Sequence, residues 1–243
     1  MPAVLLEQAT APYRPIGKFA WHFARGKLGG DPAFAGLLQR GLIPAHARLL
    51  DIGCGQGLLA ALLGSLTGHS PAEQAWPAGW APPPAGVHVR GIELMPRDVA
   101  RAQQALAALG ERARFVQGDM CTTDFGQADV AVILDVLHYV GYEAQRDVLR
   151  RVRDALAPGG TLLLRVGDAA AGLPFRISNW VDAVVTFVRG HRLSRLYCRP
   201  LADWQHLLQE LGFAVEAVPM HDGTPFANIL LVARLPQPAA HAG

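Results

Sequence analysis

Glycines occur at every second position directly after a short apolar segment that ends in an acidic residue. The run reads Leu49-Leu50-Asp51-Ile52-Gly53-Cys54-Gly55-Gln56-Gly57. Glycines permit a tight turn and allow backbone amides to approach a ligand closely. A dinucleotide fingerprint, G-x-G-x-x-G, would need a glycine at the position of Leu58. Because Asp51 would repel a pyrophosphate and attract a cation, the run favours a turn that binds a positively charged ligand.

A second acidic residue, Glu93, follows the next apolar segment, residues 87–92. A carboxylate can accept two hydrogen bonds from neighbouring hydroxyl groups, so Glu93 suits the binding of a ribose. In a compact βαβ unit this acid lies about 20 residues past the glycines, whereas positions 51 and 93 differ by 42. The proline-rich stretch 67–86 accounts for the excess as a loop insertion, which costs little stability. We therefore expect Glu93 to reach the glycine turn.

These segments resemble the motifs of class I S-adenosylmethionine-dependent methyltransferases. Asp51–Gly57 resembles motif I, D/E-x-G-x-G-x-G, and the later motifs follow in the family's order at 91–94, 117–120, 128–140 and 156–162. The resemblance implies S-adenosylmethionine as the cofactor. The ammonium and sulfonium groups of that molecule suit an acidic residue beside the turn.

The resemblance also implies which residues hold the methyl donor. Glu93 would bind the ribose hydroxyls, and Asp119 with the next backbone amide would hold the edge of the adenine. Asp135 would act through its backbone or as a helix N-cap, and both interpretations stay open. Arg25 or Lys27 would face the donor's carboxylate. The expected donor-binding set is Asp51, Gly53, Cys54, Gly55, Gly57, Glu93, Leu94, Asp119, Met120, Asp135, Arg25 and Lys27.

His138 is the candidate catalytic residue. It follows the apolar segment 130–134, at the edge of the sheet where ligands of such folds bind. An imidazole with a pKa near neutrality is a natural base for a phenol or a carboxylic acid. The alternative is a packing or helix-capping histidine. The neighbouring Tyr139 would line the donor pocket or pack.

Strand and helix patterns alternate from about Arg48 onward. Strands are expected at 48–52, 87–92, 114–117, 130–134, 161–166, 214–218 and 228–234, and helices at 57–66, 99–109, 143–157 and 201–211. This alternation predicts an α/β fold, a doubly wound and mostly parallel sheet with helices on both faces. The resemblance implies seven strands, of which the last is antiparallel.

The expected methyltransferase domain spans residues 48–235, with segments outside the alternation. Residues 1–47 are expected to form a helical lid, and 168–200 an insertion on the substrate side. Within that insertion, apolar residues at helical spacing from 177 to 188 fit a core helix or a pocket wall. Residues 236–243 are expected to form a flexible tail.

The composition of this 243-residue chain excludes several classes of protein. With 51% hydrophobic and 17% charged residues it is globular, and a net charge of +2 is too small to indicate nucleic-acid binding. Three cysteines without a CxxC pair argue against a disulfide framework and a zinc site. No apolar run reaches the ~20 residues of a bilayer span, and the N-terminus does not resemble a signal peptide. A cytoplasmic protein without a metal is expected.

These features predict methyl transfer by direct displacement to a small-molecule acceptor. The first expectation is O-methylation of an acidic or phenolic metabolite. The stretch from Leu162 to Arg234 also resembles bacterial methyltransferases that accompany polyketide-like aryl pigment pathways. N- or C-methylation and a non-catalytic S-adenosylmethionine-binding module are the alternatives, and the oligomeric state is open. A basic cluster would meet an acidic acceptor, free or tethered to a carrier protein, or would lie in water. Its members are Arg189, His191, Arg192, Arg195 and Arg199.

Overall fold

The computed structural model describes residues 1–67, 76–167, 196–220 and 228–237. Its helices are α1 (Ala3–Thr10), α2 (Lys18–Gly30), α3 (Pro32–Gln39), α4 (Leu58–Ser65), α5 (Pro96–Ala105), α6 (Tyr142–Ala155) and α8 (Leu201–Glu210), with short 3-10 helices η1 (Ala11–Tyr13), η2 (Ala107–Arg112) and η3 (Leu137–Tyr139). Its strands are β1 (Arg48–Ile52), β2 (His88–Glu93), β3 (Ala113–Gln117), β4 (Ala128–Leu134), β5 (Leu156–Gly167), β6 (Ala214–Pro219) and β7 (Asn228–Arg234). The chain divides into a first unit, residues 1–124 with 128–130, and a second unit, residues 125–127 with 131–243.

The strands are hydrogen-bonded in the order β3-β2-β1-β4-β5-β7-β6. In the first unit β2 pairs in parallel with both β1 and β3, in registers that place Ile52 beside Ile92 and Glu93 beside Gln117. In the second unit β7 pairs antiparallel with β5 and with β6. The expected seven-stranded sheet with an antiparallel last strand is confirmed. Because β1, β2 and β3 are parallel, their carboxyl ends lie at one edge, where ligands of such sheets bind.

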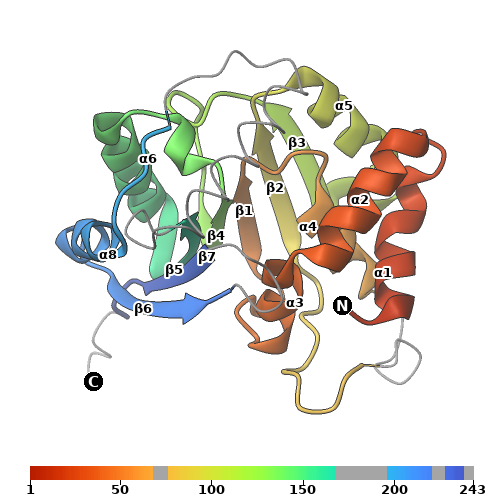
Figure 1. The fold of residues 1–243 in the computed structure, drawn as a ribbon, viewed down its shortest axis with the longest axis horizontal. Helices are drawn as coiled ribbons and strands as arrows, with labels where there is room; N and C mark the ends of the chain where they lie inside the picture. Colours follow the sequence, from red (N-terminus) through yellow and green to blue (C-terminus); the bar gives the residue numbers. More distant parts are fainter. Residues whose placement is uncertain (68–75, 168–195, 221–227, 238–243) are drawn as a thin grey trace. The chain divides into compact units, whose positions relative to one another are not determined.

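The N-terminal helices of the first unit pack on one another and on the helix that follows the glycine turn. Helix α1 lies against both α2 and α4 (Figure 1), and it buries Leu5 and Ala9. Helix α4 is apolar almost throughout, so its residues 58–63 are all buried. The expected N-terminal helical segment is therefore present and belongs to the core of the first unit. Its action as a lid stays a prediction.

In the second unit, α6 and β5 meet earlier in the chain than the sequence pattern suggested. Helix α6 ends at Ala155, and β5 already begins at Leu156. The backbone explains this difference, because Gly160 O accepts a hydrogen bond from Leu235 N at 2.9 Å and Gly159 N donates to Pro236 O at 3.2 Å. Strand pairing thus extends beyond the expected start at position 161, and the Pro-Gly-Gly segment lies within the strand.

Several expectations concern residues outside the described ranges. The apolar stripe 177–188 lies there, as do Arg189, His191, Arg192 and Arg195, positions 68–75 of the insertion and most of the tail. Among the described residues, no helix combines the length and the apolar character that crossing a membrane requires.

Candidate functional site

The glycine run forms a turn between β1 and α4 that most side chains could not adopt. Gly53, Gly55 and Gly57 have φ angles of 75°, 55° and 79°, in the left-handed region that favours glycine. At Gly57 an added Cβ would lie 2.9 Å from the Phe115 ring, so packing also requires glycine there. At Gly55 an added Cβ would meet nothing within 4 Å. The backbone at Gly55 therefore borders open space, which fits the close approach of a ligand.

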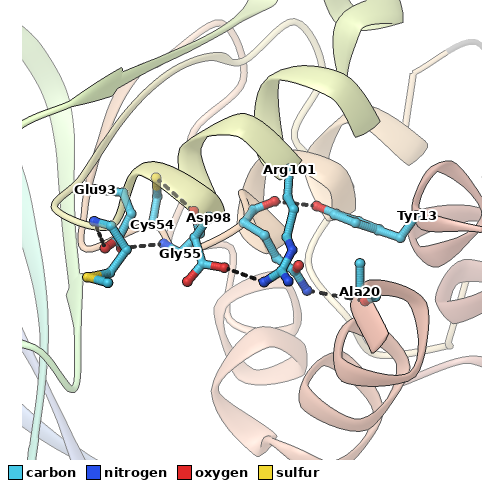
Figure 2. Close-up of polar contacts among 9 residues, drawn as sticks. Tyr13, Ala20, Cys54, Gly55, Glu93, Asp98 and Arg101 are labelled. Atoms are coloured by element: carbon cyan, nitrogen blue, oxygen red, sulfur yellow. Dashed lines mark hydrogen bonds and ion pairs between the residues drawn. The ribbon is translucent and has the colours of Figure 1, made fainter. Parts of the chain in front are cut away.

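Glu93 lies directly against this turn. Its Oε2 accepts a hydrogen bond from Gly55 N at 2.9 Å, and its Oε1 accepts one from Met95 N at 2.9 Å (Figure 2). The parallel pairing of β1 with β2 places the ends of these strands side by side despite the long loop between them. The expectation that Glu93 reaches the turn is thereby met in the geometry. Its binding of a ribose stays a prediction.

Carboxylates gather around the turn and give it a negative field. The side chain of Asp51 is buried, and burial together with the charge of Glu93 raises the pKa of Asp51 to about 7. Burial raises the pKa of the Cys54 thiol well above its usual range, and the charges of Asp51, Glu93 and Asp98 raise it further. A ligand that carries positive charge would relieve this repulsion, whereas a pyrophosphate would add to it.

Asp119 and Leu94 follow the ends of the neighbouring strands. Gly118 N donates to the backbone oxygen of Glu93 at 3.0 Å, so the loop after β3 continues alongside β2. Asp119 is exposed, and its Oδ1 accepts a hydrogen bond from Cys121 N at 2.8 Å. Leu94 is 56% exposed, so its side chain is accessible at this edge of the sheet. Met120, half-buried, follows Asp119 at the same edge.

Arg25 and Lys27, on α2, are engaged within the N-terminal helices. Arg25 Nη1 lies 2.6 Å from Glu7 Oε2, and its guanidinium lies 5.4 Å from the centre of the Trp21 ring. Lys27 Nζ lies 2.8 Å from Asp31 Oδ2. A donor carboxylate would have to compete with these acidic partners, so the role expected for either residue stays a prediction.

Two buried residues that no motif singled out also meet at the turn. Tyr13 Oη donates a hydrogen bond to the backbone oxygen of Gln56 at 2.7 Å, and Gln56 Nε2 donates to Ala20 O at 3.2 Å (Figure 2). The first bond joins positions 43 residues apart. No local pattern could have indicated that pairing.

Asp135 and His138 belong to the second unit. Asp135 has a left-handed φ of 57°, and its carboxylate forms a two-pronged ion pair with the buried Arg165 of β5. The 3-10 helix η3 has Val136 as its N-cap and no side-chain cap, so the interpretation of Asp135 as a helix cap was wrong. Its expected action through the backbone stays a prediction. Arg165 was missed, although a lone arginine between Leu162 and Val166 signals a buried cation that needs an acidic partner.

His138 is half-buried in η3 beside Tyr139, with 4.4 Å between the ring centres. Its backbone oxygen accepts a hydrogen bond from Tyr197 N at 2.9 Å. Burial lowers the pKa of His138 below its ordinary value, and the charge of Asp135 partly offsets that effect. The imidazole is therefore neutral at neutral pH, which is the protonation state of a general base.

Arg199, the member of the basic cluster that the structure describes, is held by neighbours in the second unit. Its Nε donates to Gln145 Oε1 at 2.8 Å, and its Nη2 donates to Tyr142 O at 3.0 Å. Its guanidinium also lies over the rings of Tyr142 and Trp204. These contacts account for Arg199 without an acceptor. In the described part of the chain, no group of three or more His, Cys, Asp or Glu side chains is placed to hold a metal ion.

Comparison with known proteins finds a family model and curated relatives that match part of this chain. Residues 50–162 match the family model described as Methyltransferase domain. A carboxy-S-adenosyl-L-methionine synthase of Chromohalobacter salexigens is 30% identical over 132 residues, which cover 53% of this chain and 43% of that protein. The tetracenomycin polyketide synthesis 8-O-methyl transferase TcmO of Streptomyces glaucescens is 35% identical over 54 residues, 22% of this chain and 16% of that protein. The chain thus spans less than half the length of these curated relatives.

Solved structures share the fold at low sequence identity. An O-methyltransferase family protein from Burkholderia thailandensis superposes with a TM-score of 0.62 at 19% identity, over 88% of this chain and 57% of that one. The magnesium protoporphyrin IX methyltransferase of Synechocystis PCC 6803, solved with bound SAH, gives a TM-score of 0.59 at 20% identity, over 94% and 96% of the two chains.

Proposed function

We propose that this chain, whose residues 50–162 match a methyltransferase domain, is a class I S-adenosylmethionine-dependent methyltransferase that methylates an oxygen of a small acidic or phenolic acceptor. The observation that carries the proposal is the contact of Glu93 with Gly55 N at 2.9 Å, in a turn surrounded by carboxylates. That arrangement offers one ligand an approachable backbone at Gly55, an acid with acceptor capacity left and negative charge. S-adenosylmethionine combines a ribose with a sulfonium and an ammonium.

The proposed donor-binding residues hold and orient S-adenosylmethionine. The open backbone at Gly55 lets the ligand approach, Glu93 has acceptor capacity left for the two ribose hydroxyls, and Asp119 is exposed for the adenine. Asp51, buried just before the turn, supplies negative charge in its ionised form. When bound, S-adenosylmethionine supplies a methyl group on a positively charged sulfur. Alignment and proximity of the acceptor then contribute most of the rate enhancement of a direct displacement.

His138 is the residue of the second unit that we assign to the acceptor. A neutral imidazole can take the proton of a phenol or a carboxylic acid while the oxygen attacks the methyl group. TcmO, which is named as an 8-O-methyl transferase of polyketide synthesis, supports oxygen on an aromatic polyketide-like scaffold as the acceptor class. The same acceptor tethered to a carrier protein would suit a basic surface, and nitrogen or carbon acceptors are the competing chemistry.

The experiment that tests the proposal is an acceptor screen with the purified chain. Phenolic and carboxylic metabolites are incubated with S-adenosylmethionine, and products are measured by mass spectrometry for a gain of one methylene unit. Formation of O-methyl products would support the proposal, and N- or C-methyl products would replace its acceptor class. Donor binding by calorimetry without turnover of any acceptor class would instead support a non-catalytic S-adenosylmethionine-binding module.

A further inference from the structure

A buried joint connects the N-terminal helices to the glycine turn. We call it the Tyr13–Gln56 joint, and it consists of the bond from Tyr13 Oη to Gln56 O at 2.7 Å and the bond from Gln56 Nε2 to Ala20 O at 3.2 Å. Tyr13 ends η1, Ala20 lies in the first turns of α2, and Gln56 lies between two glycines of the turn. In Figure 2, Tyr13 and Ala20 lie on one side of Gly55 and Glu93 lies on the other.

The joint is polar and buried, and any polar atom there without a hydrogen bond lowers stability. Tyr13 and Gln56 are 0% and 1% exposed, respectively. Burial raises the pKa of Tyr13 well above its usual range, so the hydroxyl keeps its proton and donates at any physiological pH. Gln56 Oε1 is buried without a hydrogen-bond partner among the described residues. An apolar side chain at position 56 would avoid that loss, so an amide here indicates a role in orientation.

The hydrogen bond from Tyr13 holds one peptide of the glycine turn, whose orientation has to be fixed. Gln56 O belongs to the peptide that joins Gln56 to Gly57, and the amide of that peptide, Gly57 N, donates to Cys54 O at 2.9 Å. Two residues before Gly57, the amide of Gly55 donates to Glu93 Oε2. Glycines have little intrinsic preference between left- and right-handed conformations, so bonds from outside the turn are needed to hold a single arrangement.

We propose that Tyr13 is a positioning residue, which through Gln56 couples the order of α2 to the donor-binding conformation of the glycine turn. This inference rests on the proposed function, since it takes the turn as the donor site. Coupling of this kind is reciprocal. A donor that binds the ordered turn therefore stabilises the first turns of α2, and loss of the joint weakens donor binding without removing any group that contacts the donor.

The first test measures the affinity of S-adenosylhomocysteine, the demethylated product, by calorimetry for Tyr13→Phe. The variant keeps the buried ring and loses the hydrogen bond, and we expect its Kd to rise about tenfold. Thr10→Val is the matched control, because the buried Thr10 hydroxyl donates only within the N-terminal helix, to Leu6 O at 2.8 Å and Glu7 O at 3.4 Å. We expect this control to lose stability while its Kd stays at the wild-type value. Equal Kd values for wild type and Tyr13→Phe would overturn the inference.

The second test uses hydrogen exchange, which a merely structural role would not change in the same way. In the wild type, S-adenosylhomocysteine should slow exchange of the backbone amides of residues 20–24, and in Tyr13→Phe this protection should be lost. Gln56→Met keeps the backbone oxygen of residue 56 and removes the bond to Ala20, so it should show the same loss of protection. This variant replaces Tyr13→Phe in the test if Tyr13→Phe does not fold. Protection that persists in the folded variants would contradict the coupling. A wild-type protein that binds no S-adenosylhomocysteine would instead contradict the proposed function itself.

Discussion

The carboxylate of Glu93 accepts a hydrogen bond from Gly55 N at 2.9 Å, although 38 positions separate the two residues. Parallel pairing of β1 with β2 produces this contact, because it brings the carboxyl ends of both strands to one edge of the sheet. The insertion between the strands is therefore accommodated without displacing the acid from the turn.

Replacement of Glu93 by alanine should weaken S-adenosylmethionine binding more than tenfold, or by about 1.4 kcal/mol. The variant loses the acceptor that we propose for the ribose hydroxyls and also the bond that holds Gly55 N. Calorimetry provides the measurement. Glu111→Ala is the control, since Glu111 is exposed in η2, pairs with Arg114 of β3 and precedes that strand, at the end remote from Asp119. An unchanged affinity of Glu93→Ala would assign the ribose to another acid.

Donor affinity should decrease as the pH falls below about 7. The pKa of Asp51 is raised to about 7 by burial and by the charge of Glu93, so the carboxyl is increasingly protonated below that pH. A cationic donor favours the ionised form, and binding in this range therefore releases a proton. Calorimetry in buffers of different ionisation enthalpy measures the release. Asp51→Asn should bind more weakly at pH 8 and should lose the pH dependence; a pH dependence retained in this variant would point to another group.

The same pKa makes the donor-free protein less stable as the pH rises. The folded state holds the Asp51 proton up to about pH 7, whereas an unfolded chain releases it near pH 4. The folded state binds more protons between these values, so stability is lost as pH increases through this window. Asp51→Asn should therefore be more stable than the wild type at pH 8, by at most a few kcal/mol. Denaturant titrations of the wild type and of Asp51→Asn at pH 5 and pH 8 measure this difference in stability. A variant less stable than the wild type at both pH values would contradict the raised pKa of Asp51.

Replacement of His138 should lower turnover and leave donor binding intact. If the imidazole is the general base, His138→Ala should reduce kcat by roughly 10²–10⁴. Because burial lowers the pKa of His138, the acidic limb of the wild-type rate profile should lie below the ordinary value of a histidine. His206→Gln, at an exposed position of α8, is the control and should turn over normally. Near-normal turnover of His138→Ala would assign the residue to packing.

The ion pair of Asp135 with Arg165 should be essential for stability of the second unit. Arg165 is 2% exposed, so Asp135→Asn removes the negative charge of Asp135 from beside a buried guanidinium and should cost about 3 kcal/mol. The double variant Asp135→Asn with Arg165→Met removes that cation and should recover most of the loss. Denaturant titration of both variants provides the measurement. A single variant within 0.5 kcal/mol of the wild type, the usual range of surface substitutions, would show that solvent compensates the charge.

Local patterns sufficed to predict the elements and the glycine turn. Strand β7 spans the expected residues 228–234, and the turn residues lie between β1 and α4 as expected. These features depend on properties of neighbouring residues, namely apolar periodicity and the conformational freedom of glycine. The position of Glu93 at the turn was also predictable, since consecutive strands joined by a crossover are usually neighbours in the sheet.

Contacts between distant residues were decided only by the tertiary structure. The sequence by itself determined a βαβ framework, an acidic glycine turn and acids at the strand ends. Packing decided that Tyr13 bonds to Gln56 across 43 positions, that Asp135 pairs with Arg165, and that Arg25 faces Glu7. It also decided the early start of β5, through backbone bonds to residues 235 and 236. A side chain's partner in a folded chain depends on which buried polar groups the packing brings within hydrogen-bond distance, and residue type and local spacing do not contain that information.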